Sequence, residues 1–173
     1  MHLKATENFW IIFAATLFLS GCSTPGLADE ITSHCLSNEE VYFTCLMKNG
    51  KTLSLCGSAK ALSYRYGKAG NLELIFPSAA PQSIKQFKYN NYLRYGVDYY
   101  RVSFLSGQYY YRIYRDIDSE LTPQIQAGII VESKSSINKK EINLSCVDSI
   151  NDNLSKLSEF LECDEENALG CTD

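Results

Sequence analysis

Residues 97–115 read VDYYRVSFLSGQYYYRIYR, and this stretch decides the fold class. Two runs of aromatic and β-branched residues flank Ser106-Gly107, a dipeptide suited to a tight turn between antiparallel strands. With that turn, Phe104 lies opposite Tyr109, and the pairs further along the hairpin are aromatic or β-branched as well. One face of the hairpin is therefore expected to belong to the core.

The other face of the hairpin is rich in tyrosine and arginine. These residues give protein-binding surfaces large contact areas and directional hydrogen bonds. Strand propensity and the need for a wet outer face explain the same composition, so both interpretations stay open. The candidate partner-binding residues are Ser106, Tyr110, Arg112, Arg101, Tyr99 and Tyr114.

A second hairpin is indicated at Asn49-Gly50, where both residues tolerate positive φ between β-rich runs. With this pair at the tip, Cys45 faces Ser54, and Cys56 lies one diagonal step away on the same face. A Cys45–Cys56 disulfide is the expected pairing there.

Further strands are expected along the chain, followed by one helix near the C-terminus. Asp148 is a candidate cap, and Ile150, Leu154, Leu157 and Leu161 recur at helical spacing. The fold class expected is mainly β: an antiparallel β-sandwich or small barrel with one C-terminal helix, stapled by disulfides. The additional expected strands cover 61–66, 71–76, 129–131 and 141–145.

The N-terminus carries an apolar run that ends in Leu19-Ser20-Gly21-Cys22. This tetrapeptide resembles the lipobox of bacterial lipoproteins. The resemblance implies that Cys22 is lipidated, and that Ser23, in place of Asp, favours the outer membrane of the bacterial envelope. The alternative is cleavage within 26–28, which leaves Cys22 an ordinary cysteine.

The expected organisation is a signal peptide over 1–21, a lipidated tether over 22–34 and a single β-rich domain with its helix over 35–173. Once Cys22 carries lipid, an even number of cysteines remains, as expected for disulfides in an oxidising compartment. Cys163 and Cys171 are close enough in sequence to close a local loop. The six disulfide candidates are Cys35, Cys45, Cys56, Cys146, Cys163 and Cys171.

Composition and motifs argue against several function classes. The net charge is −4, and without a basic run no nucleic-acid partner is expected. No C-x-x-C pair occurs and His34 is the one histidine after the signal, so neither a metal site nor a cofactor is expected. The alternating acids Asp116, Asp118 and Glu120 are interpreted as a solvated turn rather than a calcium loop. Without a nucleophile elbow or phosphate loop, we expect no enzyme.

A second resemblance concerns Ser106-Gly107-Gln108-Tyr109-Tyr110. It is similar to the Ser-Gly-x-Tyr and Ser-Gly-x-x-Tyr motifs of periplasmic and membrane-bound lysozyme inhibitors, which are small β-barrels. The stretch Tyr42–Cys45 ahead of Asn49-Gly50 looks like the opening strand of that family. The resemblance implies that Ser106 and Tyr110 enter the enzyme's cleft, with Arg112 as a cationic partner for its catalytic carboxylates.

The predicted function is that of a membrane-anchored envelope lipoprotein acting as a non-catalytic binding module, with lysozyme inhibition as its specific form. The expected partners are the membrane, through the lipid anchor, and a lysozyme or another envelope protein. Two alternatives are open: a structural envelope lipoprotein, and an immunity protein against an envelope-targeting toxin.

Overall fold

A computed structural model describes residues 32–78, 83–135 and 140–172, so the lipobox with Cys22 lies outside the described residues. Strands form where aromatic and β-branched residues alternate with polar ones, and turns form at glycine. The strands are β1 (Glu40–Met47), β2 (Thr52–Ser58), β3 (Ala61–Lys68), β4 (Asn71–Phe76), β5 (Phe87–Arg94), β6 (Val97–Ser106), β7 (Tyr109–Asp118), β8 (Thr122–Ser133), β9 (Glu141–Asp152) and β10 (Glu162–Cys163). Two 3-10 helices are η1 (Ser83–Gln86) and η2 (Leu154–Glu159).

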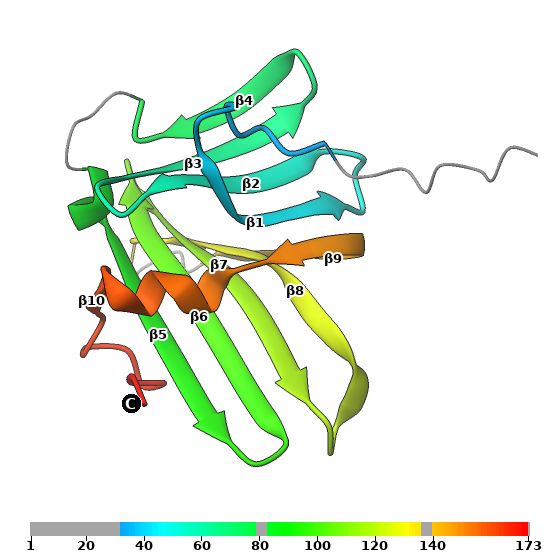
Figure 1. Ribbon diagram of the computed structural model, residues 1–173, viewed down its shortest axis with the longest axis vertical. Helices are drawn as coiled ribbons and strands as arrows, with labels where there is room; N and C mark the ends of the chain where they lie inside the picture. Colours follow the sequence, from blue (N-terminus) through cyan, green and yellow to red (C-terminus); the bar gives the residue numbers. More distant parts are fainter. Residues whose placement is uncertain (1–31, 79–82, 136–139, 173) are drawn as a thin grey trace, which may run out of the picture.

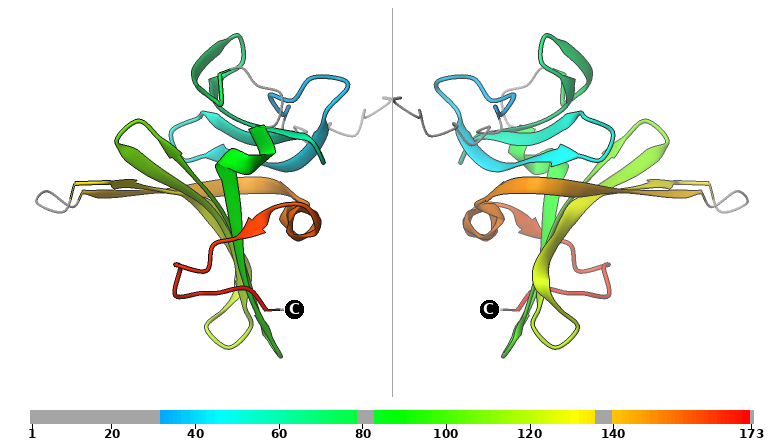
Figure 2. Two further views of the ribbon diagram at one scale, coloured as in Figure 1. Left: turned by 90° about the vertical axis from the view of Figure 1, so that its left-hand side faces the viewer. Right: turned by 90° about the vertical axis from the view of Figure 1, so that its right-hand side faces the viewer.

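The ten strands form one sheet in the order β10-β5-β6-β7-β8-β9-β1-β2-β3-β4. Strand β9 belongs to both halves of it, because residues 141–145 pair with β8 and residues 146–152 pair with β1. The sheet thus bends over itself, with β1–β4 above the long strands β5–β8 (Figures 1 and 2). The mainly β prediction is confirmed. The prediction of a small barrel is wrong, because the sheet is open: its edge strands β10 and β4 do not pair with each other.

The core lies between the two halves of the bent sheet. The Phe104 ring of β6 is 5.1 Å from the ring of Tyr64 on β3 and 4.5 Å from the ring of Phe76 on β4. Burial of the Tyr64 hydroxyl raises the pKa of this residue well above its ordinary value. The two halves are therefore held together by buried aromatic contacts across the bend as well as by strand β9.

The predicted registers of the two hairpins need correction. In the first, Met47 N donates to Lys51 O at 2.8 Å, which places Cys45 opposite Leu53 instead of Ser54. In the second, the turn falls on Gly107-Gln108, and Phe104 pairs with Tyr111. The register of the first hairpin differs from the predicted one by one residue, which exchanges the two faces of the strand. The register of the second differs by two residues, so each side chain stays on its predicted face.

The predicted C-terminal helix is wrong. Residues 148–152, where the helix was expected to begin, continue strand β9, and only the 3-10 helix η2 follows. Asp152 accepts a hydrogen bond from the amide of Leu154, the first residue of η2, at 3.1 Å. Leu154, Leu157 and Leu161 are nevertheless buried in the core, which accounts for their spacing.

The three disulfides expected from the even cysteine count are present, as Cys35–Cys56, Cys45–Cys146 and Cys163–Cys171. The local Cys163–Cys171 loop is confirmed, and the Cys45–Cys56 pairing is wrong. The one-residue register slip explains the error, because it turns Cys45 into the core toward β9. Cys56 faces the segment that precedes β1.

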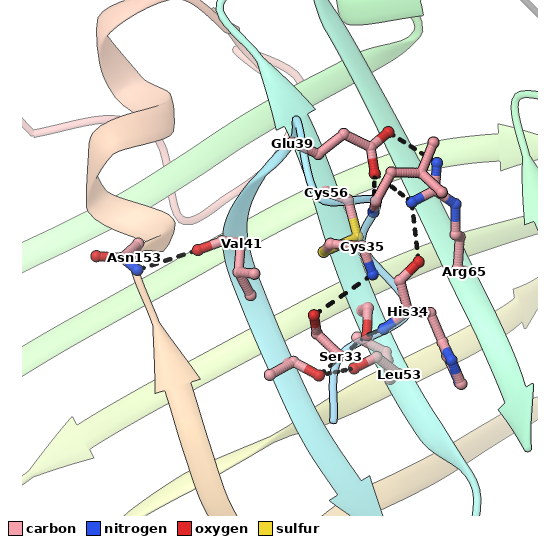
Figure 3. The surroundings of a disulfide bond; sticks show 12 residues. Ser33, His34, Cys35, Glu39, Val41, Leu53, Cys56, Arg65 and Asn153 are labelled. Carbon is pink, nitrogen blue, oxygen red and sulfur yellow. Dashed lines mark hydrogen bonds and ion pairs between the residues drawn. A yellow bond between two sulfur atoms is a disulfide. The ribbon is translucent and has the colours of Figure 1, made fainter. Parts of the chain in front are cut away.

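That preceding segment is fastened to β2 and β3 (Figure 3). Beside the Cys35–Cys56 bond, Arg65 donates to both carboxylate oxygens of Glu39 and to the carbonyl of His34. His34 in turn donates its amide hydrogen to Ser54 Oγ at 3.0 Å. We call this set the N-terminal clasp; it fixes the chain to the β1–β4 half from residue 34 onward.

Within the described residues, no helix has the length and apolar character needed to cross a membrane.

Candidate partner-binding cleft

The outer face of β6 and β7 divides into a part that is bonded internally and a part that is open. In the bonded part, Arg101 forms a bidentate ion pair with Asp116. Its guanidinium lies 5.8 Å and 5.6 Å from the ring centres of Tyr99 and Tyr114. The neighbouring charges and rings therefore already occupy Arg101.

The two tyrosines of this part have partners of their own. Tyr99 donates its hydroxyl to Asp118 at 2.7 Å, and Tyr114 donates to Asn143 at 3.1 Å. The bond from Tyr99 lowers the pKa of the Asp118 carboxyl, and the same bond raises the pKa of the Tyr99 hydroxyl. Tyr114 is buried. Of the six predicted binding residues, these two and Arg101 serve the fold in the structure.

The open part lies toward the β6–β7 turn, where Tyr110 and Arg112 line two adjoining hollows of about 290 and 330 Å³. Tyr110 is exposed, and Arg112 is half-buried with Nη2 3.6 Å from Glu132 Oε2. Both hollows share one wall from the C-terminal loop. The side chains lining the cleft include Lys88, Ser103, Leu105, Tyr110, Arg112, Lys134, Asp164, Glu166 and Asn167.

The C-terminal wall of the cleft is held by β5. Asn90, fully buried, donates its amide hydrogens to the carbonyls of Asp164 and Gly170 at 2.9 and 3.2 Å. Lys88 Nζ lies 3.7 Å from Asp164 Oδ1, and the Cys163–Cys171 bond closes the loop behind. The wall is thus built from contacts between residues more than 70 positions apart in the sequence.

Two ion pairs in the cleft are long. The ion pairs of Arg112 and Lys88 span 3.6 and 3.7 Å, beyond the range of a good charge-assisted hydrogen bond. An exposed aromatic ring beside such groups offers a partner a stacking surface and charges that can exchange partners at small cost. The cleft is therefore suited to binding.

Ser106 sits at the end of β6, next to the cleft. It pairs with Tyr109 across the Gly107-Gln108 turn and is half-buried, while the four residues that follow it are exposed. Gln108 O accepts a hydrogen bond from Lys134 N at 2.9 Å, which holds the turn against the end of β8. Tyr110 and Arg112 thus line the same cleft, whereas Ser106, paired with Tyr109, lies on the opposite face of the hairpin and does not line it.

Sequence reasoning missed Asn90 and the wall that it supports. It also missed Arg115, which is buried on the inner face of β7 between two carboxylates. Arg115 Nη1 lies 2.7 Å from Asp98 Oδ2, and its Nε lies 2.8 Å from Asp152 Oδ2. A tyrosine ring completes this site, since the Arg115 guanidinium lies 5.1 Å from the ring centre of Tyr100. No motif signals these long-range pairs.

Within the described residues, one group of side chains brings potential metal-ligand atoms close together, but we assign no metal ion to it. Cys35, Glu39 and Cys56 bring donor atoms within 4.8 Å of one another, but both cysteines are joined in a disulfide. Arg65 binds the Glu39 carboxylate and lowers the pKa of that carboxyl. All three residues of this group therefore take part in the bonds of the N-terminal clasp.

No family model, curated protein or solved structure matches the chain.

Proposed function

We propose that the protein is a membrane-anchored lipoprotein of the bacterial envelope that acts as a non-catalytic binding module, and that its specific activity is inhibition of a lysozyme. The observation that carries the proposal is the cleft lined by Tyr110 and Arg112, next to the exposed residues that follow Ser106. An exposed turn beside an aromatic ring and a cation suits insertion into the groove of an enzyme.

In this proposal the β6–β7 turn, Tyr110 and Arg112 each have a defined task. The β6–β7 turn enters the substrate groove of the lysozyme, and Tyr110 packs against its wall. Arg112 moves from its loose pair with Glu132 to the catalytic carboxylates of the enzyme, whose negative charges it complements. The three disulfides favour the same compartment, because such bonds persist in an oxidising envelope.

The test uses the chain from Ser23 to Asp173, which carries all ten described strands and all three disulfides. It is added to bacterial cell walls together with each of several lysozymes, and lysis is followed by turbidity. We expect slower lysis by at least one of the enzymes at a stoichiometric concentration. Lysis by every enzyme at an unchanged rate, even with the protein in large excess, would contradict inhibition.

The anchor is tested separately with the full chain expressed in a Gram-negative bacterium. Because acyl chains on Cys22 would hold the protein in the membrane, Cys22→Ser is expected to move it from the membrane fraction to the soluble fraction. Retention of the variant in membranes to the wild-type extent would argue against lipidation at this cysteine.

A structural envelope lipoprotein is the second candidate. It is favoured by the internal bonding of Arg101, Tyr99 and Tyr114, which uses half of the predicted binding face within the fold itself. The lysis assay separates the two, because a structural role gives no protection.

A further inference from the structure

The end of the molecule farthest from β1–β4 exposes apolar side chains that neither the core nor the cleft uses. The β5–β6 and β7–β8 turns lie side by side there, beyond the part of β5–β8 that η2 covers (Figure 1). Tyr95 is 98% exposed and Leu121 is 82% exposed, one on each turn. We define the distal patch as the exposed residues Leu93, Tyr95, Leu121 and Ile125.

Hydrogen bonds join the two turns that carry the distal patch. Ser119 donates both its amide and its hydroxyl hydrogen to Gly96 O, at 2.9 and 3.1 Å, so that the two turns are tied to each other. Gly96 has a φ of 75°, and a Cβ at this position would collide with Ser119 Oγ. Exposed large apolar groups on a fixed framework bind at a smaller entropic cost than groups on a mobile loop.

Groups of both charge signs surround the patch, and their pairing is incomplete. Arg94 and Glu120 lie on the two turns with Nη2 and Oε2 3.8 Å apart, and both side chains are exposed. Asp98 lies between Leu93 and Ile117 in the cross-strand row. Its Oδ1 is buried and has no hydrogen-bond partner within the described residues. Because Asp98 already pairs with Arg115 through Oδ2, the charges that the patch offers a partner are those of Arg94 and Glu120.

We propose that the distal patch is the interface of a symmetric dimer of this chain. A two-fold axis places the same patch on both sides of the contact, so a patch with both signs is complementary to itself. Arg94 of each copy then pairs with Glu120 of the other, while Tyr95 and Leu121 pack across the axis. The acids beside Arg94 disfavour an anionic lipid surface as the occupant.

The expected dimer is weak, because the patch is small compared with the interfaces of stable dimers. A lipid anchor would favour it by confining the chains to one surface, which raises their effective concentration. The inference is independent of lysozyme inhibition, since the distal patch and the cleft share no residue.

Sedimentation velocity of the chain from Ser23 to Asp173, from micromolar to millimolar concentrations, tests the proposal. We expect the mean mass to rise toward twice that of the monomer, and the double variant Tyr95→Ser/Leu121→Ser to raise the dissociation constant at least ~10-fold. Leu36→Ser, at an exposed leucine outside the patch, is the control and should leave it unchanged. A monomer at every concentration would overturn the proposal, whether or not the protein binds lipid vesicles.

Charge exchange makes the test specific to the two-fold contact. Arg94→Glu and Glu120→Arg each create like-charge pairs across the axis, so each variant alone is expected to stay monomeric. An equimolar mixture restores both opposite-charge pairs and is expected to dimerise about as well as the wild type. Dimerisation of either single variant at wild-type strength, or no association in the mixture, would contradict this interface. Near-ultraviolet circular dichroism verifies that each variant is folded.

Discussion

At the residue scale, the N-terminal clasp shows how a single charge pair fastens a segment without secondary structure. Glu39 accepts from Arg65 Nη2 at 2.8 Å and from the Leu36 amide at 2.7 Å. The bond from Arg65 lowers the pKa of Glu39, although burial opposes it. A carboxyl whose pKa is lower in the folded state stabilises the fold above its unfolded pKa, and this contribution is lost as the pH falls through the folded pKa.

Replacing Glu39 by Gln is therefore expected to lower the free energy of unfolding at neutral pH by about 1.5–3 kcal/mol, the value of hydrogen bonds to a charged group. The difference from the wild type should shrink as the pH falls from about 6 to below the folded pKa, because the wild-type carboxyl is then protonated as well. Urea unfolding at a series of pH values measures it, with exposed Glu165→Gln as the control. A difference that is constant over this range would contradict the account.

At the element scale, local sequence patterns predicted the hairpins and the buried faces of their strands. The features that they did not predict depend on pairing between strands far apart in the sequence. The face assignment of 97–115 is confirmed because it depends only on alternation, and a register shift of two residues leaves alternation intact. The helix was wrong because residues 146–152 pair with β1, about a hundred positions earlier, and no local signal shows this. The cleft wall escaped prediction for the same reason, since it depends on Asn90.

The disulfides give an element-scale prediction. Cys45–Cys146 spans 101 residues and joins β1 to β9, whereas Cys163–Cys171 spans 8. By the loop-entropy relation, closing loops of these sizes stabilises the fold by about 4.7 and about 2.5 kcal/mol, respectively. The double variant Cys45→Ser/Cys146→Ser should therefore lose more stability in urea unfolding than Cys163→Ser/Cys171→Ser. The opposite order would show that native-state packing, rather than loop closure, sets the contribution of each bond.

At the scale of the whole molecule, the bent sheet separates three tasks. The β1–β4 half holds the N-terminal clasp, from which the proposed tether would lead to the membrane. The opposite half carries the distal patch at its far end and, on its outer face, the cleft with Tyr110 and Arg112. The domain can thus be fastened at one half while a partner binds the other.

The central claim is that the cleft binds a partner, and two adjacent tyrosines of β7 allow a matched test. Tyr109 and Tyr110 are 48% and 42% exposed, but successive strand residues point to opposite faces, and only Tyr110 lines the cleft. The measurement is the inhibition constant against a lysozyme that the wild type inhibits. Tyr110→Ala is expected to raise it at least ~10-fold, while Tyr109→Ala changes it less than about twofold. Equal effects of the two substitutions, or no effect of Tyr110→Ala, would contradict the claim.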